Sequence, residues 1–150
     1  MSDLDELYQE IVLEHNKHPA NFRKLDRANR TSEGYNPICG DRITLYLELK
    51  GDVVLDIGFQ GSGCAISRAS ASMMTESIKG KSGAEAETIF NSFHQMVTRD
   101  PGSDFDNVEL GDLEMLAGLS EFPVRVKCAT LSWHTMRAAL AGQKDAVYTE

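Results

Sequence analysis

The sequence lacks the features that mark several large classes of protein. Its three cysteines are an odd number and form no C-x-x-C pair, which argues against a disulfide framework. No apolar run approaches the roughly 20 residues that span a bilayer, and the first residues, M-S-D-L-D-E, are acidic where a secretory signal peptide is basic. The sequence therefore predicts a cytoplasmic protein without a membrane segment, whose reduced thiols bind metal or react.

Positive charge is also scarce. The chain has 15 lysines and arginines against 23 aspartates and glutamates, which gives a formal net charge of -8. Because nucleic-acid binding proteins gather lysines and arginines against the phosphates, this composition argues against a nucleic-acid partner. A protein or a small cation is the expected partner instead. With 150 residues, 41% of them hydrophobic, the chain is long enough for one core, so we predict a single domain over residues 1–150.

Hydrophobic alternation predicts one hairpin. Residues 43–49 and 53–59 each alternate, and the turn K-G-D joins them. In the second strand the apolar positions Val53, Leu55, Ile57 and Phe59 are expected to share one buried face. This pattern indicates a small antiparallel sheet.

The rest of the chain has the spacing of helices. Ser82 and Glu85 form a capping-box pattern, which marks the start of one of them. Because strands come first and helices later, without β-α-β alternation, the order predicts an α+β fold. The expected helices cover residues 2–18, 65–79, the segment after Ser82, roughly 109–119, and 128 to about 142.

The three cysteines occupy turns and predicted helix starts. Cys39 lies in the turn N-P-I-C-G-D, Cys64 follows the glycines of G-S-G, and Cys128 begins the last predicted helix. A helix N-terminus lowers the pKa of a thiol and favours the thiolate, which is the form that binds metal. Asp41, in the same turn as Cys39, adds a carboxylate. Three sulfurs and one carboxylate oxygen suit a tetrahedral zinc ion.

Other interpretations of these residues remain open from sequence alone. Each cysteine can be a separate buried apolar residue. The glycine-rich stretch before Cys64 resembles a phosphate loop, but it lacks the last glycine of G-x-G-x-x-G and no G-K-[ST] follows, so neither nucleotide fingerprint is present. His94 and His134 have no acidic or cysteine neighbour in the sequence and are predicted on helix surfaces.

Three motifs together resemble the U-type iron–sulfur cluster assembly family, the IscU and SufU proteins. They are N-P-I-C-G-D at 36–41, G-S-G-C-A-I-S at 61–67 and V-K-C-A-T-L-S-W at 126–133, in order over nearly the whole chain. The resemblance implies a metal shared by Cys39, Asp41, Cys64 and Cys128. It also implies a three-stranded antiparallel sheet backed by helices, and hence one further strand within residues 21–35.

The departures from the family pattern favour the SufU branch. Scaffold members carry a histidine directly before the third cysteine and a proline-rich chaperone-docking stretch upstream, whereas this chain has Lys127 and E-F-P-V-R-V. It also has extra residues between the second and third cysteines, as SufU-type members do. The resemblance therefore implies a zinc-dependent sulfurtransferase that takes persulfide sulfur from a pyridoxal-phosphate cysteine desulfurase of the SufS type, with the downstream Suf assembly complex as a further partner. The alternative is a scaffold that holds iron or an iron–sulfur cluster transiently.

Individual roles follow from the positions of the residues. Cys39 is the predicted sulfur acceptor, because no helix fixes it and Gly40 beside it gives the backbone freedom. Arg125 and Lys127 are two cations next to Cys128 in an otherwise acidic chain, which predicts that they bind the partner at the rim of the site. The alternative for these two residues is ordinary solvated charge.

Overall fold

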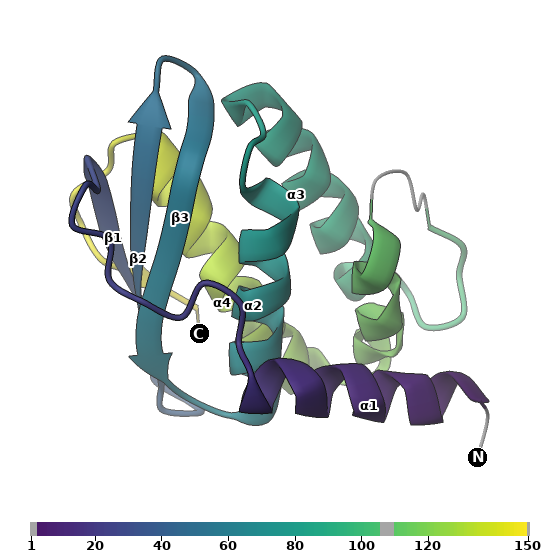
Figure 1. Cartoon of the computed structure of the whole chain (residues 1–150). Helices are drawn as coiled ribbons and strands as arrows, with labels where there is room; N and C mark the ends of the chain where they lie inside the picture. The colour runs from purple at the N-terminus through teal and green to yellow at the C-terminus, as the bar shows by residue number, and fades with distance from the viewer. Residues whose placement is uncertain (1–2, 106–109, 150) are drawn as a thin grey trace.

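A computed structural model describes residues 3–105 and 110–149 and shows one four-stranded sheet with helices gathered on one side of it (Figure 1). The strands lie in the order β3-β2-β1-β4. Helices α2 and α4 contact the sheet, and α1, α3 and η1 pack outside them. The α+β class is confirmed. The elements are α1 (Asp3–Lys17), β1 (Arg30–Asn36), β2 (Asp41–Lys50), β3 (Val53–Ser62), α2 (Ala65–Ile78), α3 (Gly83–Thr98), the 3₁₀ helix η1 (Gly111–Glu121), α4 (Pro123–Leu140) and β4 (Val147–Tyr148).

Strand β1 is the further strand that the family resemblance implied. It pairs antiparallel with β2, with Gly34 opposite Ile43, and it lies one residue beyond the expected range of 21–35 at its end. Its buried positions are Ser32, Gly34 and Asn36, so the strand has no apolar alternation that a pattern search could find. A Cβ at Gly34 would overlap the Thr135 hydroxyl, so glycine here lets α4 pack closely on the sheet.

The β2–β3 hairpin is confirmed, but the predicted face of β3 is partly wrong. Val54 is fully buried, whereas Val53 and Leu55 are 40% and 50% exposed. The cause is a β-bulge between Glu48 and Leu49, which shifts the pairing by one residue. A shift of one residue moves side chains to the opposite face of a strand, so the inward positions change along β3.

A fourth strand, β4, was not predicted. It pairs parallel with β1, with Gly34 opposite Val147 and Tyr35 opposite Tyr148. The Thr149 amide extends the pairing by donating to the Tyr35 carbonyl at 2.9 Å. Two residues are too short to show a periodic pattern. Their effect is to cover the outer edge of β1, which would otherwise expose unpaired backbone groups.

The helices agree with the prediction except at two starts. The capping box at α3 is present, with Glu85 N donating to Ser82 Oγ at 3.1 Å. Helix η1 covers 111–121 where 109–119 was expected, and residue 109 lies outside the described residues. Helix α4 begins at Pro123, so the prediction that Cys128 starts this helix is wrong. Proline is favoured at the first helical position because its missing N–H has no partner there in any case. No helix within 3–105 or 110–149 is long and apolar enough to cross a membrane.

The core between α2, α3 and α4 is centred on Trp133, the only tryptophan of the sequence. Its side chain is fully buried and stacks on Phe93 with the ring centroids 4.5 Å apart. The indole N–H donates to the Ser70 hydroxyl at 3.1 Å. One side chain therefore ties together three helices through both apolar and polar contacts.

Candidate metal centre

Cys39, Asp41 and Cys128 come together where the β1–β2 connection meets α4. One ligand atom from each lies within 4.8 Å of the others, and the two sulfurs are 3.4 Å apart. Asp41 and Cys128 are only 2% and 1% exposed, whereas Cys39 is half-buried. The group therefore combines a buried carboxylate and a buried thiol with one accessible thiol.

A tight turn positions Cys39. The Gly40 amide donates to the Asn36 carbonyl at 2.9 Å, which closes the turn around residues 37–39. Gly40 has φ of +73°, a left-handed conformation that glycine adopts at little cost. The turn leaves Cys39 at the tip of the hairpin and brings Asp41 in as the first residue of β2.

Asn36 is a buried neighbour of the group that the sequence analysis missed. Its side-chain nitrogen lies 3.5 Å from Asp41 Oδ2 and 3.7 Å from Cys128 Sγ. Its side-chain oxygen has no hydrogen-bond partner in the described part of the chain. The signal was available, because Asn36 begins the N-P-I-C-G-D motif that contains Cys39 and Asp41.

Cys64 lies beside this group and contacts it through the backbone. Its amide donates to Asp41 Oδ1 at 2.9 Å, and its sulfur accepts a hydrogen bond from Ser67 N at 3.4 Å as the N-cap of α2. The predicted helix start at Cys64 is confirmed. Among the described residues, the close group of ligand atoms does not include the Cys64 sulfur, so its role as a fourth ligand stays a prediction.

Gly63 makes room for the carboxylate. A Cβ at this position would lie 2.6 Å from Asp41 Oδ1 and 3.1 Å from Asp41 Cγ. Real Cβ atoms do not come this close, so any larger residue would displace the carboxylate from the Cys64 amide. The glycines before Cys64 are therefore explained by close packing around Asp41, and a phosphate loop is not needed to account for them.

Replacing Gly63 by alanine should lower the free energy of unfolding by about 1–3 kcal/mol, the usual cost of overpacking a buried site, and should weaken metal binding. Urea denaturation and a competitive zinc titration measure the two effects. Gly118→Ala is the matched control, since no atom lies within 4 Å of a Cβ at Gly118. Equal losses in the two variants would contradict the packing role of Gly63.

The electrostatics of Cys128 differ from the prediction. Burial, then the thiol of Cys39 and the negative charges of Cys64 and Asp41, raise the pKa of the Cys128 thiol. The predicted lowering by a helix start is wrong, because Cys128 lies in the second turn of α4. In the absence of a metal, this thiol is protonated at neutral pH.

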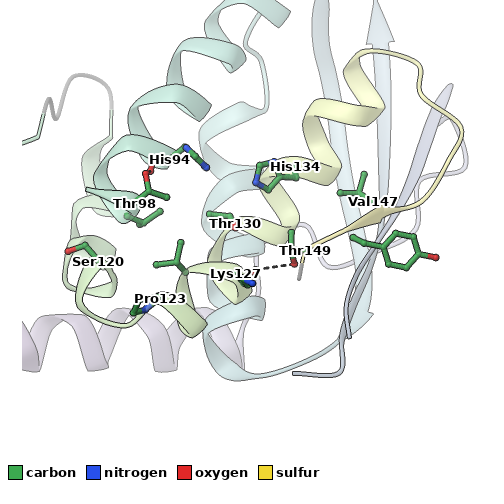
Figure 2. Close-up of a pocket in the computed structure, with 12 residues that line it drawn as sticks. His94, Thr98, Ser120, Pro123, Lys127, Thr130, His134, Val147 and Thr149 are labelled. Carbon is green, nitrogen blue, oxygen red and sulfur yellow. Dashed lines mark hydrogen bonds between the residues drawn. The ribbon is translucent and has the colours of Figure 1, made fainter. Parts of the chain in front are cut away.

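The two predicted cations lie in different surroundings. The side chain of Cys128, and then the charges of Cys64 and Cys39, raise the pKa of Arg125, so its guanidinium lies within the field of the thiols. Lys127 instead lines a cavity between α3, α4 and β4 (Figure 2). Since successive residues of a helix point about 100° apart, Lys127 and Cys128 face different directions. The partner-binding role of Lys127 stays a prediction.

The fold and the site define a class: a small sheet backed by helices, with a cysteine-aspartate-cysteine group between a hairpin tip and a helix. Residues 7–129 match the family model described as "NifU-like N terminal domain". The chain belongs to this family, and the resemblance to SufU and IscU proteins is confirmed.

Individual relatives give the same result. The chain is 43% identical over 144 residues to the zinc-dependent sulfurtransferase SufU of Bacillus subtilis, with 95% of each chain covered. It is 39% identical to the iron–sulfur cluster assembly scaffold protein IscU of Streptococcus pyogenes, covering 97% of this chain and 90% of that one. Among solved structures, a putative iron–sulfur cluster assembly scaffold protein for the SUF system from Fervidobacterium islandicum has a TM-score of 0.82 and 36% identity, covering 90% of this chain and 97% of that chain.

Proposed function

We propose that this chain is a zinc-dependent sulfurtransferase that accepts persulfide sulfur from a cysteine desulfurase and supplies it to iron–sulfur cluster assembly in the cytoplasm. The observation that carries the proposal is the accessible Cys39 thiol at a turn tip, 3.4 Å from the buried Cys128 sulfur and close to the buried Asp41 carboxylate. The similarity to the Bacillus subtilis SufU protein supports it. The expected partner is a pyridoxal-phosphate desulfurase of the SufS type, and the pyridoxal phosphate stays on that partner.

The donor set fits zinc. A buried carboxylate is costly without a cation nearby, and Asp41 lies against two sulfurs, which are ligands that zinc binds well. Cys39, Asp41 and Cys128 would hold the ion, with Cys64 as the fourth ligand from the start of α2. Zinc bound here would keep the thiols deprotonated at neutral pH.

Cys39 is the proposed acceptor: Cys128 is buried, and Cys64, which is half-buried like Cys39, is fixed as the N-cap of α2. The Cys39 thiolate attacks the outer sulfur of the donor persulfide; a new S–S bond forms on Cys39 while the donor's S–S bond breaks and the donor cysteine leaves as a thiolate. The hydrogen of the persulfide stays on the transferred sulfur. Cys128 is 1% exposed and cannot meet a partner's sulfur without local opening. Arg125, beside the thiols, stabilises negative charge on sulfur during the transfer.

Replacing Arg125 by glutamate should lower stimulation of desulfurase turnover roughly tenfold, which corresponds to the loss of about one charge-assisted contact. The zinc content should not change. Desulfurase turnover is measured as alanine production with and without the variant. Arg27→Glu is the control, because Arg27 is exposed on the loop before β1. Lys127→Gln in the same assay tests the predicted role of that residue, and equal stimulation by Arg125→Glu and the wild type would contradict the role of Arg125.

A scaffold function is the second candidate, because relatives such as the Streptococcus pyogenes protein are named scaffolds and the same ligand group could hold iron. Lys127 stands where scaffold members carry a histidine, which favours sulfur transfer. Anaerobic reconstitution with iron and sulfide separates the two functions. If the visible absorption and the iron both stay with the protein through gel filtration, the result supports the scaffold. If the iron is lost and zinc is retained, the result supports the sulfurtransferase.

A further inference from the structure

The cavity that contains Lys127 has a volume of about 520 Å³ and lies between α3, α4 and β4 (Figure 2). The nitrogen-containing ionisable side chains that line it are His94, Lys127 and His134. No carboxylate lines it among the described residues, although the protein has a net charge of -8. The size falls within the range of small-molecule sites, and the charge of the lining is opposite to that of the chain as a whole.

Phe90 holds the two imidazoles in place. The His94 ring stacks on it at 5.8 Å with an interplanar angle of 8°, and the His134 ring meets it edge-on at 5.3 Å. The imidazoles are 5.7 Å apart and nearly perpendicular. The prediction that these histidines lie on helix surfaces missed this cluster, because α3 and α4 bring them together only in the fold. Burial, then the charges of His94 and Arg137, lower the pKa of His134, so its neutral imidazole offers one N–H donor.

The remaining lining separates into polar and apolar groups. The polar groups are hydroxyls, of which those of Ser120 and Thr130 belong to residues only 8% and 4% exposed. The Thr149 hydroxyl donates to the Lys127 carbonyl at 3.4 Å and fixes the wall made by the C-terminal strand (Figure 2). The accessible apolar surface comes from Pro123, Val126, Val147 and the ring of Tyr148, whereas Val97 is fully buried behind it. The cavity therefore presents hydrogen-bond donors together with an apolar surface.

A second cavity adjoins the first and contains one further cation. It has a volume of about 470 Å³ and shares His134, Val147 and Tyr148 with the first. It adds Arg137, whose guanidinium pairs with Glu87 at 3.0 Å. No carboxylate lines this cavity either, within the part of the chain that the structure describes.

We propose that the first cavity binds a small organic anion, with its carboxylate or phosphate group at Lys127, His94 and His134 and its apolar part against Pro123, Val126 and Val147. A charged amine, imidazole N–H groups and hydroxyls are the donors that anionic oxygens require. A metal ion is disfavoured, since the ammonium group of Lys127 would repel it and no carboxylate balances its charge. The site is separate from the metal centre, so this proposal does not rest on sulfur transfer.

Isotope-edited NMR of the zinc-loaded full chain tests the site with three probes at constant ionic strength: inorganic phosphate, succinate and, as the neutral control, succinamide. Saturable shifts of the Lys127, Thr130 and His134 amides are expected with phosphate, succinate or both, and none with succinamide. Binding of one anion alone identifies the group that the site prefers. Lys127→Gln should weaken the affinity roughly tenfold or more.

Two further variants control for indirect effects. Lys127→Arg keeps the charge and should retain most of the affinity, while Lys144→Gln removes an exposed lysine outside the lining and should change nothing. The proposal is overturned if neither anion gives a saturable shift at concentrations on the order of tens of millimolar, if succinamide binds equally, or if the folded Lys127→Gln protein binds as the wild type does. None of these results bears on the sulfur-transfer proposal, which the Cys39 and Arg125 variants test separately.

Discussion

Replacing Cys39 by serine should abolish sulfur transfer from a cysteine desulfurase, a loss of at least about 100-fold in the rate, because serine is a far weaker nucleophile. The fold should remain, since Cys39 is half-buried at a turn tip and its neighbours Asp41 and Cys128 stay in place. Radiolabelled sulfur delivered from cysteine by the desulfurase measures acceptance. Circular dichroism and zinc analysis of the same variant establish that the protein is folded and retains a substantial fraction of its metal.

The other two cysteines provide the contrast. Cys64→Ser and Cys128→Ser should lose metal together with the stability that it supplies, since each removes an expected sulfur ligand, and serine at position 64 can still cap α2. Alkylation followed by peptide mass spectrometry maps the persulfide in the wild type. A label on Cys64 or Cys128 with Cys39 unmodified would contradict the assignment of Cys39 as the acceptor, without affecting the family membership.

Removing zinc with a chelator should lower the midpoint of thermal unfolding by about 10 °C or more. Structural zinc contributes on the order of 10 kcal/mol in zinc-finger peptides, and about 3–5 kcal/mol of that is enough for such a shift in a chain of this size. The expected ligands join the tip of the β1–β2 hairpin to α4, so a bound metal would tie two distant parts of the chain together. Scanning calorimetry of the zinc-loaded and chelated protein measures the shift.

Re-addition of zinc should restore the midpoint, and magnesium should not, because magnesium prefers oxygen ligands. Asp41→Ala provides the matched variant: its unfolding midpoint should already be low and should respond little to the chelator. An unchanged midpoint after chelation, or a purified wild-type protein that native mass spectrometry finds folded and free of metal, would contradict a resident zinc.

The parts of the fold that the sequence predicted are those with strong local signals. The β2–β3 hairpin has alternating apolar residues, and α3 has the Ser82–Glu85 capping box. Strand β1 escaped detection because Ser32, Gly34 and Asn36 face the core, where apolar residues are expected. The bulge at Glu48 and β4 arise from pairing between strands, which no local pattern records.

The candidate site was predicted largely because its motifs are local. Cys39 and Asp41 share one turn, and Cys128 was grouped with them by its chemistry and by the family resemblance. The predicted position of Cys128 at the start of its helix was wrong, because α4 already begins at Pro123. The sequence did not predict that Arg125 and Lys127 lie within α4. Only the structure therefore shows that Arg125 lies near the thiols while Lys127 lines a cavity.

The burial of Trp133 has a practical consequence for fluorescence. A lone indole that is fully buried and stacked on Phe93 emits at shorter wavelength than one in water, so unfolding should shift the emission of this protein to the red. No other tryptophan contributes to the signal. Because Trp133 and Cys128 lie on the same helix, the emission during a zinc titration tests, without any added label, whether zinc binding changes the packing of α4.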